Sequence, residues 1–114
     1  MIEITERDFD KEVLDCVLPV FVCFTTQWSR TCYPTCLYAD QLAEEYNGSV
    51  KFVRVDIEKS PKIMEIYHVI AVPTILIFNS TLEVNRLLGF QDRISLRPLL
   101  DSLVKERDSL LEGS

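Results

Sequence analysis

The stretch VFVCFTTQWSRTC, residues 20–32, runs from a continuous apolar segment into a polar loop that holds a tryptophan and a cysteine. Its first five residues, Val20 to Phe24, are all apolar, which is typical of a central strand covered by helices on both faces. A second pattern starts at the end of the stretch, where mostly apolar residues recur at the spacing of one helical face: Cys32, Cys36, Ala39, Ala43 and Tyr46. The stretch therefore predicts a buried strand followed by an amphipathic helix.

The rest of the chain continues this alternation of strands and helices. The pattern predicts a strand at 2–4, a helix from a Thr5 capping box to about Asp15, a strand at 50–57, a helix from 61 to about 67, strands at 74–78 and 84–88, and a C-terminal helix. The order βαβαβαββα indicates an α/β fold whose central mixed sheet is flanked by helices on both faces. We expect a single domain over residues 1–112, with a polar tail at 113–114.

Composition excludes several classes of function. The net charge is -6 and no Lys/Arg cluster is longer than a pair, so we expect no nucleic-acid partner. No apolar run is long enough to cross a bilayer and the N-terminus does not resemble a secretory signal, so we expect a cytoplasmic protein without a membrane partner. The four cysteines then read as thiols in a reducing compartment. Their spacing, with His68 far away, predicts no metal site and no cofactor.

The strand leading into Trp28, the later Val72-Pro73-Thr74 before another strand, and the order of elements resemble the thioredoxin family over nearly the whole chain. In that family a strand ends in Trp-Cys-Gly-Pro-Cys, and a segment with a cis proline faces the first cysteine. A glycine after the last strand completes the substrate groove. The resemblance implies the thioredoxin fold and a groove formed by Trp28, Val72, Pro73, Thr74 and Gly89.

The active-site segment departs from the family pattern at its first cysteine. Counted from Trp28, the family's Cys-Gly-Pro-Cys falls on Ser29-Arg30-Thr31-Cys32. In the family the first cysteine is the nucleophile, because a helix N-terminus lowers its pKa and the thiolate attacks a disulfide. A serine hydroxyl is too weak an acid to ionise there. Ser29 is therefore a degenerate nucleophile position, and we expect it to cap the helix instead.

Two further positions differ from the family in the same direction. The buried Asp that is thought to move protons to the inner thiol of thioredoxins is matched here by Cys23, and its Lys partner is matched by Arg54. Arg54 keeps a cation but does not readily release a proton. Since Cys23 lies inside an apolar run, we interpret it as a small core residue.

An alternative uses the thiols that are present, with Cys32 and Cys36 as a CxxxC pair or Cys32 alone. Residues four apart on a helix have alpha carbons about 6 Å apart, towards the long end of what a disulfide spans. Pro34 bears on this alternative, because a helix capped by Ser29 would place the proline where its ring clashes with the preceding turn. If the helix instead begins near Cys32 or Tyr33, Cys32 lies close to a helix N-terminus and has some thiolate character.

The sequence thus predicts a thioredoxin-like protein with an atypical active site. We expect it to bind a peptide or protein partner, such as a thiol or disulfide-containing protein, through the cis-proline groove with little or no dithiol reductase activity. The alternative is an atypical thiol-disulfide oxidoreductase whose catalytic residue is Cys32, alone or with Cys36.

Overall fold

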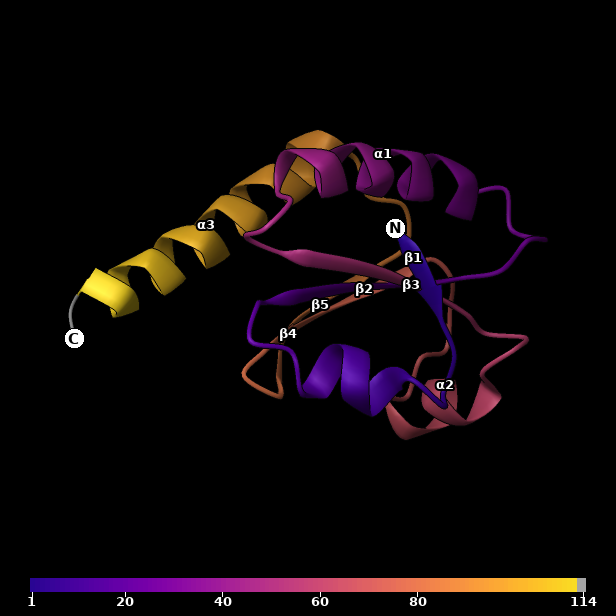
Figure 1. The fold of residues 1–114 in the computed structure, drawn as a ribbon. Helices are drawn as coiled ribbons and strands as arrows, with labels where there is room; N and C mark the ends of the chain where they lie inside the picture. The colour runs from indigo at the N-terminus through magenta and orange to yellow at the C-terminus, as the bar shows by residue number, and fades with distance from the viewer. Residues whose placement is uncertain (113–114) are drawn as a thin grey trace.

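The computed structural model describes the backbone of residues 1–112 and the side chains of residues 1–108, so the predicted tail at 113–114 lies outside the described residues. The chain alternates strands and helices in the predicted order (Figure 1). The elements are β1 (Ile2–Ile4), η1 (Asp10–Leu14), β2 (Val20–Thr25), α1 (Cys32–Glu45), β3 (Lys51–Asp56), α2 (Pro61–Ile66), β4 (Thr74–Asn79), β5 (Leu82–Leu88) and α3 (Arg93–Glu112).

The five strands form one mixed sheet in the order β1-β3-β2-β4-β5. β3 is parallel to both β1 and β2, whereas β4 is antiparallel to β2 and β5. The parallel β2 and β3 are joined by the crossover helix α1, as two adjacent parallel strands require. The predicted mixed sheet is therefore confirmed.

Helices cover both faces of this sheet. Figure 1 shows α1 and α3 over one face, with η1 and α2 over the other. Residues of β2 alternate between the two layers, with Val22 packing among the residues of η1 and α2 and Phe21 among those of α1 and α3. All six β2 residues are buried, since a central strand has no solvent face.

One row of residues across the sheet lies on the face covered by α1 and positions the side chains of the candidate site. Its members, each opposite the next in the strand register, are Glu3, Arg54, Cys23, Ile75 and Leu87. Residues directly opposite in neighbouring strands project to the same face of a sheet. Because Cys23 packs with the residues of α1, Arg54 and Glu3 also project towards that helix.

The first helical segment differs from its prediction. The capping box at Thr5 predicts an α-helix from there, but the helix is a short π-helix that starts at Asp10. Thr5 Oγ1 instead donates to Asp8 Oδ2 at 3.4 Å, and the Asp8 N–H donates to the Thr5 carbonyl at 3.0 Å. These two bonds close a separate turn before the helix, so Thr5 is not its cap.

Candidate functional site

Three chain segments meet at one edge of the sheet. Phe24 near the end of β2 lies opposite Thr74 at the start of β4, and Thr74 lies opposite Leu88 at the end of β5. The loop after β2, the segment before β4 and the segment after β5 therefore emerge together. These are the three segments that carry the predicted groove residues.

The loop after β2 shows where helix α1 begins. The helix starts at Cys32 with Thr31 before it, and no side chain caps its first turn. The expectation that Ser29 is the N-cap is wrong, because the Ser29 hydroxyl lies 2.9 Å from the Thr31 hydroxyl and the Ser29 carbonyl accepts from the Cys32 N–H at 3.3 Å. The late start puts Pro34 in the first turn, where a missing N–H costs no helical hydrogen bond.

The segment before β4 presents an unpaired peptide group. The Val72–Pro73 peptide bond is cis, and the Gly89 N–H donates to the Pro73 carbonyl at 2.8 Å. The Thr74 hydroxyl donates to the Ala71 carbonyl at 2.6 Å, so this buried side chain closes the turn rather than lining an open groove. Within the part of the chain that the structure describes, neither the N–H nor the C=O of half-buried Val72 has a hydrogen-bond partner.

Exposed apolar side chains lie on the two segments that emerge beside this one. Trp28 is 79% exposed and Phe90, which follows Gly89, is 49% exposed. Phe90 contacts the Tyr38 ring of α1 at a centroid distance of 6.2 Å. We call the group formed by exposed Trp28 and Phe90, half-buried Ser29, Val72 and Gly89, and buried Pro73 the rim.

Buried Thr35 fixes part of the rim from below. Its hydroxyl accepts a hydrogen bond of 3.2 Å from the backbone N–H of Gln91, the residue after Phe90. Thr35 is fully buried in the first turns of α1. The bond therefore ties the helix to the segment after β5 and holds Phe90 in place.

A pocket of about 250 Å³ opens beside Ser29 and reaches down to the cysteines of α1. We call it the thiol pocket; it is lined by Glu3, Thr25, Thr26, Gln27, Ser29, Cys32, Tyr33, Cys36, Arg54 and Asp56. Cys32 is only 3% exposed, whereas Cys36 one turn later is half-buried. The more accessible thiol of the CxxxC pair is thus the second, although its place in the helical stripe predicts a core position.

The closest thiol partner of Cys36 is Cys23 rather than Cys32. Cys23 is fully buried on β2 beneath α1, and the two thiols form a hydrogen bond. This bond is the largest influence on both groups: it lowers the pKa of Cys36 and raises the pKa of Cys23, and burial raises the pKa of Cys23 further. Cys23 is a core residue as expected, but it also has a polar partner.

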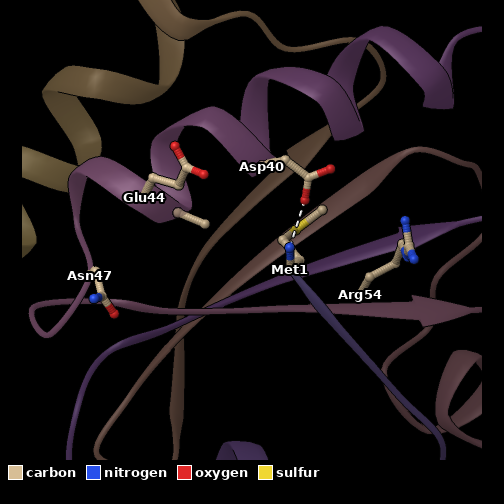
Figure 2. A pocket seen from close by; sticks show the side chains of 6 residues that line it. Met1, Asp40, Glu44, Asn47 and Arg54 are labelled. Carbon is tan, nitrogen blue, oxygen red and sulfur yellow. Dashed lines mark hydrogen bonds and ion pairs between the residues drawn. The ribbon is translucent and has the colours of Figure 1, made fainter.

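Charged groups on α1 and on β3 also act on the Cys36 thiol. Arg54 lowers the pKa of Cys36, while the Asp40 carboxylate and partial burial raise it. Figure 2 shows Arg54 and Asp40 in a neighbouring pocket of about 580 Å³, with the Met1 amine 2.6 Å from Asp40 Oδ1. The Met1 amine also lowers the pKa of Cys36, and among the charges Arg54 has the largest effect, after the Cys23 hydrogen bond and burial. Arg54 is itself only loosely paired, with its Nε 3.8 Å from Glu3 Oε1.

The pairing of Cys23 with Cys36 is the feature that sequence reasoning missed. Two separate signals pointed to it, since Cys23 occupies the family position of a buried proton carrier and Cys36 belongs to the helical stripe that faces β2. Only the register of β2 against β3 and the packing of α1 bring the two together with Arg54.

The thiols stand apart from any metal-binding arrangement. Among the described residues, no group of three or more His, Cys, Asp and Glu side chains is placed to hold a metal ion. All four cysteines are free thiols. A search of the described helices also finds none with the length and apolarity needed to cross a membrane.

Comparison with known proteins places this architecture in a family. The family model for thioredoxin matches residues 1–102, which include the whole sheet. The thioredoxin of Rickettsia felis is 32% identical over 93 residues, covering 82% of this chain and 89% of its own length. That of Porphyra purpurea is 30% identical over 102 residues, covering 90% and 95%. Thioredoxin 1 of Nostoc sp. is 29% identical over 99 residues, covering 87% and 92%.

The sheet order, the helices on both faces and these matches define an α/β protein of the thiol-disulfide redox class. The chain belongs to the thioredoxin family and has the thioredoxin fold.

Proposed function

We propose that this thioredoxin-family protein binds extended peptide segments of protein partners at the rim, with little or no dithiol reductase activity. The observation that carries the proposal is the unpaired peptide group of Val72, which lies between two segments that carry exposed apolar side chains. An extended chain can pair with such a group as an added strand, and this affinity requires no thiol. In this proposal the groove residues are Trp28, Val72, Pro73 and Gly89, with Thr74 supporting the turn from within.

The low reductase activity follows from Ser29. Reduction of a disulfide by two thiols needs an accessible thiolate to attack and a second thiol to resolve the mixed disulfide. Ser29 occupies the attacking position and Cys32 behind it is almost fully buried. The first step therefore has no nucleophile at the rim.

The test is a titration of the ¹⁵N-labelled protein with extended, cysteine-free peptides rich in β-branched and aromatic residues. We expect the Val72 amide resonance to shift and the fluorescence of Trp28, the single tryptophan, to change with the same dissociation constant. Trp28→Ala should weaken binding about tenfold, because exposed aromatic anchors dominate such contacts. Val17→Ala is the matched control, since Val17 is 86% exposed but precedes β2 at the opposite edge of the sheet.

Two results would contradict the proposal. Equal weakening by Trp28→Ala and Val17→Ala would show that the peptides bind without using the rim. Insulin reduction by the unmodified protein that disappears in Cys32→Ser would instead establish the oxidoreductase alternative that uses Cys32.

A further inference from the structure

We propose that Cys36 and Cys23 form a second thiol site beneath the rim, in which Cys36 attacks a small hydroperoxide in the thiol pocket and Cys23 resolves the product as a disulfide. The inference goes beyond the proposed peptide binding and does not depend on it, because neither thiol lies on the rim. It rests on the packing of Cys36 against the core cluster that contains Cys23, on the pocket that Cys36 and Arg54 line, and on the charge of Arg54.

Burial assigns different roles to the two thiols. Cys36 lines the thiol pocket and is half-buried, so a small reagent can reach its sulfur. Cys23 is fully buried, so a reagent in the pocket does not reach it directly. The first attack must therefore come from Cys36, and Cys23 can act only on a modified Cys36.

Charge supports the same assignment. A thiolate is the nucleophilic form of cysteine, and neighbouring cations and hydrogen-bond donors favour it. Cys36 has a hydrogen-bond partner in Cys23 and a cation in Arg54, and both lower the pKa of its thiol. Cys32 lines the same pocket but is only 3% exposed. Cys36 is thus the more accessible thiol of the pocket, and it has a cation beside it.

The size of the pocket selects the co-reactant. A volume of about 250 Å³ between α1 and the sheet admits a hydroperoxide but not a folded substrate. Thr25, Thr26 and Ser29 contribute hydroxyl groups to its wall and Arg54 contributes a guanidinium. These groups can donate hydrogen bonds to the departing oxygen of a peroxide.

The reaction balances without any further reagent. The Cys36 thiolate attacks one peroxide oxygen, the O–O bond breaks, and the leaving alkoxide or hydroxide takes a proton to form an alcohol or water. Cys36 is then a sulfenic acid. The Cys23 sulfur attacks the Cys36 sulfur, an S–S bond forms, and the S–O bond breaks with loss of water that carries the Cys23 proton. Two thiols are oxidised to one disulfide while the peroxide is reduced.

The experiment treats the reduced, full-length protein with hydrogen peroxide and follows the products by intact mass and peptide mapping. We expect a loss of two hydrogens and a crosslink between the peptides of Cys23 and Cys36. In Cys23→Ala the sulfenic acid should persist at Cys36 and be trapped by dimedone. In Cys36→Ala the crosslink should disappear, and in Cys16→Ala, whose thiol packs on the opposite face of the sheet, it should form as in the unmodified protein.

The rate of the first step tests the role of Arg54. Alkylation of Cys36 should be about tenfold faster than that of Cys16, a half-buried thiol among the residues of the opposite face. Arg54→Met should move the pH profile of that alkylation to higher pH, and Arg54→Lys should restore it. The other charged or titratable groups facing Cys36 are Cys23, Cys32, Asp40, Glu3, Asp56 and the Met1 amine, and they are the same in all three proteins.

The outcomes separate this inference from the peptide-binding proposal. A crosslink between Cys32 and Cys36, or one that forms in Cys36→Ala, would overturn the pairing. If Cys36 is alkylated no faster than Cys16, the Cys36 thiol is not activated and the proposal is wrong. This rate is measured on the unmodified protein, so the result holds even if one of the cysteine variants fails to fold. Peptide binding that survives in Cys36→Ala, together with loss of the crosslink, is the combination we expect.

Discussion

The rim and the layer of thiols beneath it correspond to different parts of the thioredoxin active-site pattern. In the proposed function the rim holds a peptide, and Ser29 places a hydroxyl where the family pattern has the attacking thiol. Beneath it Cys23 takes the place of the carboxylate in the family pattern, and Cys23 and Cys36 interact with each other and with Arg54. In the two proposals, peptide binding and thiol chemistry therefore lie at different depths of the same edge of the sheet.

If both proposals hold, a fold that lacks the nucleophile at the rim can still carry a reactive thiol in the layer beneath it. A buried carboxylate at the Cys23 position could only accept or donate a proton, whereas a thiol there can also form a covalent bond. Substitutions can return one of these regions to the family pattern or loosen the contact between them.

The largest expected effect comes from placing a carboxylate back in the inner layer. Cys23→Asp should lower the free energy of unfolding by about 3 kcal/mol at neutral pH, because an ionised group is buried next to a thiol of low pKa. Cys23→Ala should cost only about 1 kcal/mol, as a small cavity does. Urea unfolding of both variants measures the difference.

The pH dependence of Cys23→Asp has a definite sign. Burial raises the folded-state pKa of the introduced carboxyl above its unfolded value, so the penalty grows as pH rises through the folded pKa and fades at acid pH. Equal stability of Cys23→Asp and Cys23→Ala at neutral pH would show that Arg54 neutralises this layer completely.

The next effect comes from returning the rim to the family pattern. Ser29→Cys creates a Cys-Arg-Thr-Cys segment and should raise insulin reduction about tenfold above that of the unmodified protein. The gain is modest because residue 29 lies before the helix start at Cys32, so the helix N-terminus favours its thiolate only weakly. Ser29→Ala is the control and should leave the rate unchanged. No gain would mean that Cys32 is too buried to resolve a mixed disulfide.

A smaller effect follows from loosening the contact between α1 and the rim. Thr35→Val leaves the Gln91 N–H without its acceptor and should cost about 1 kcal/mol of stability. Thr35→Ser keeps the hydroxyl and should retain most of it. Because Phe90 is held through this bond, peptide affinity should fall in Thr35→Val but thiol oxidation should not. Loss of both activities would show that the two regions are coupled.

The sequence was sufficient for the fold because its local signals are independent of one another. The apolar run at 20–24 requires a central strand, and the order of elements leaves few topologies for a mixed sheet. The helical stripe from Cys32 to Tyr46 also predicted which face of α1 is covered. All of these depend on periodicity, which a sequence displays directly.

The site was harder to predict because it depends on register and on helix starts. Ser29 has the composition of an N-cap, but Pro34 favours a start at Cys32, and a clash with the preceding turn outweighs the stabilisation that one cap provides. The contact between Cys23 and Cys36 joins residues on two elements whose relative rotation no local pattern states. Cys23 replaces a proton carrier of the family pattern, but that substitution does not state which side chain of α1 lies above it.

The smallest predicted effect concerns the far end of α1, where an ionisable group has no contact with the thiols. Burial and a hydrogen bond to Asp101 on α3 raise the pKa of Tyr46 to about 12. Since the folded pKa lies above the ordinary value of 10, the stabilisation is complete below pH 10 and is lost as pH rises towards 12. The ultraviolet absorbance of tyrosinate should therefore show a late-titrating group that Tyr46→Phe removes and Tyr33→Phe, at an exposed position, does not.

Tyr46→Phe should leave the alkylation profile of Cys36 unchanged, because no Tyr46 contact acts on that thiol. If the pH profile of Cys36 alkylation shifts in this variant, the Tyr46 hydroxyl affects the Cys36 thiol along α1. The inner thiols would then not be independent of the rest of the helix.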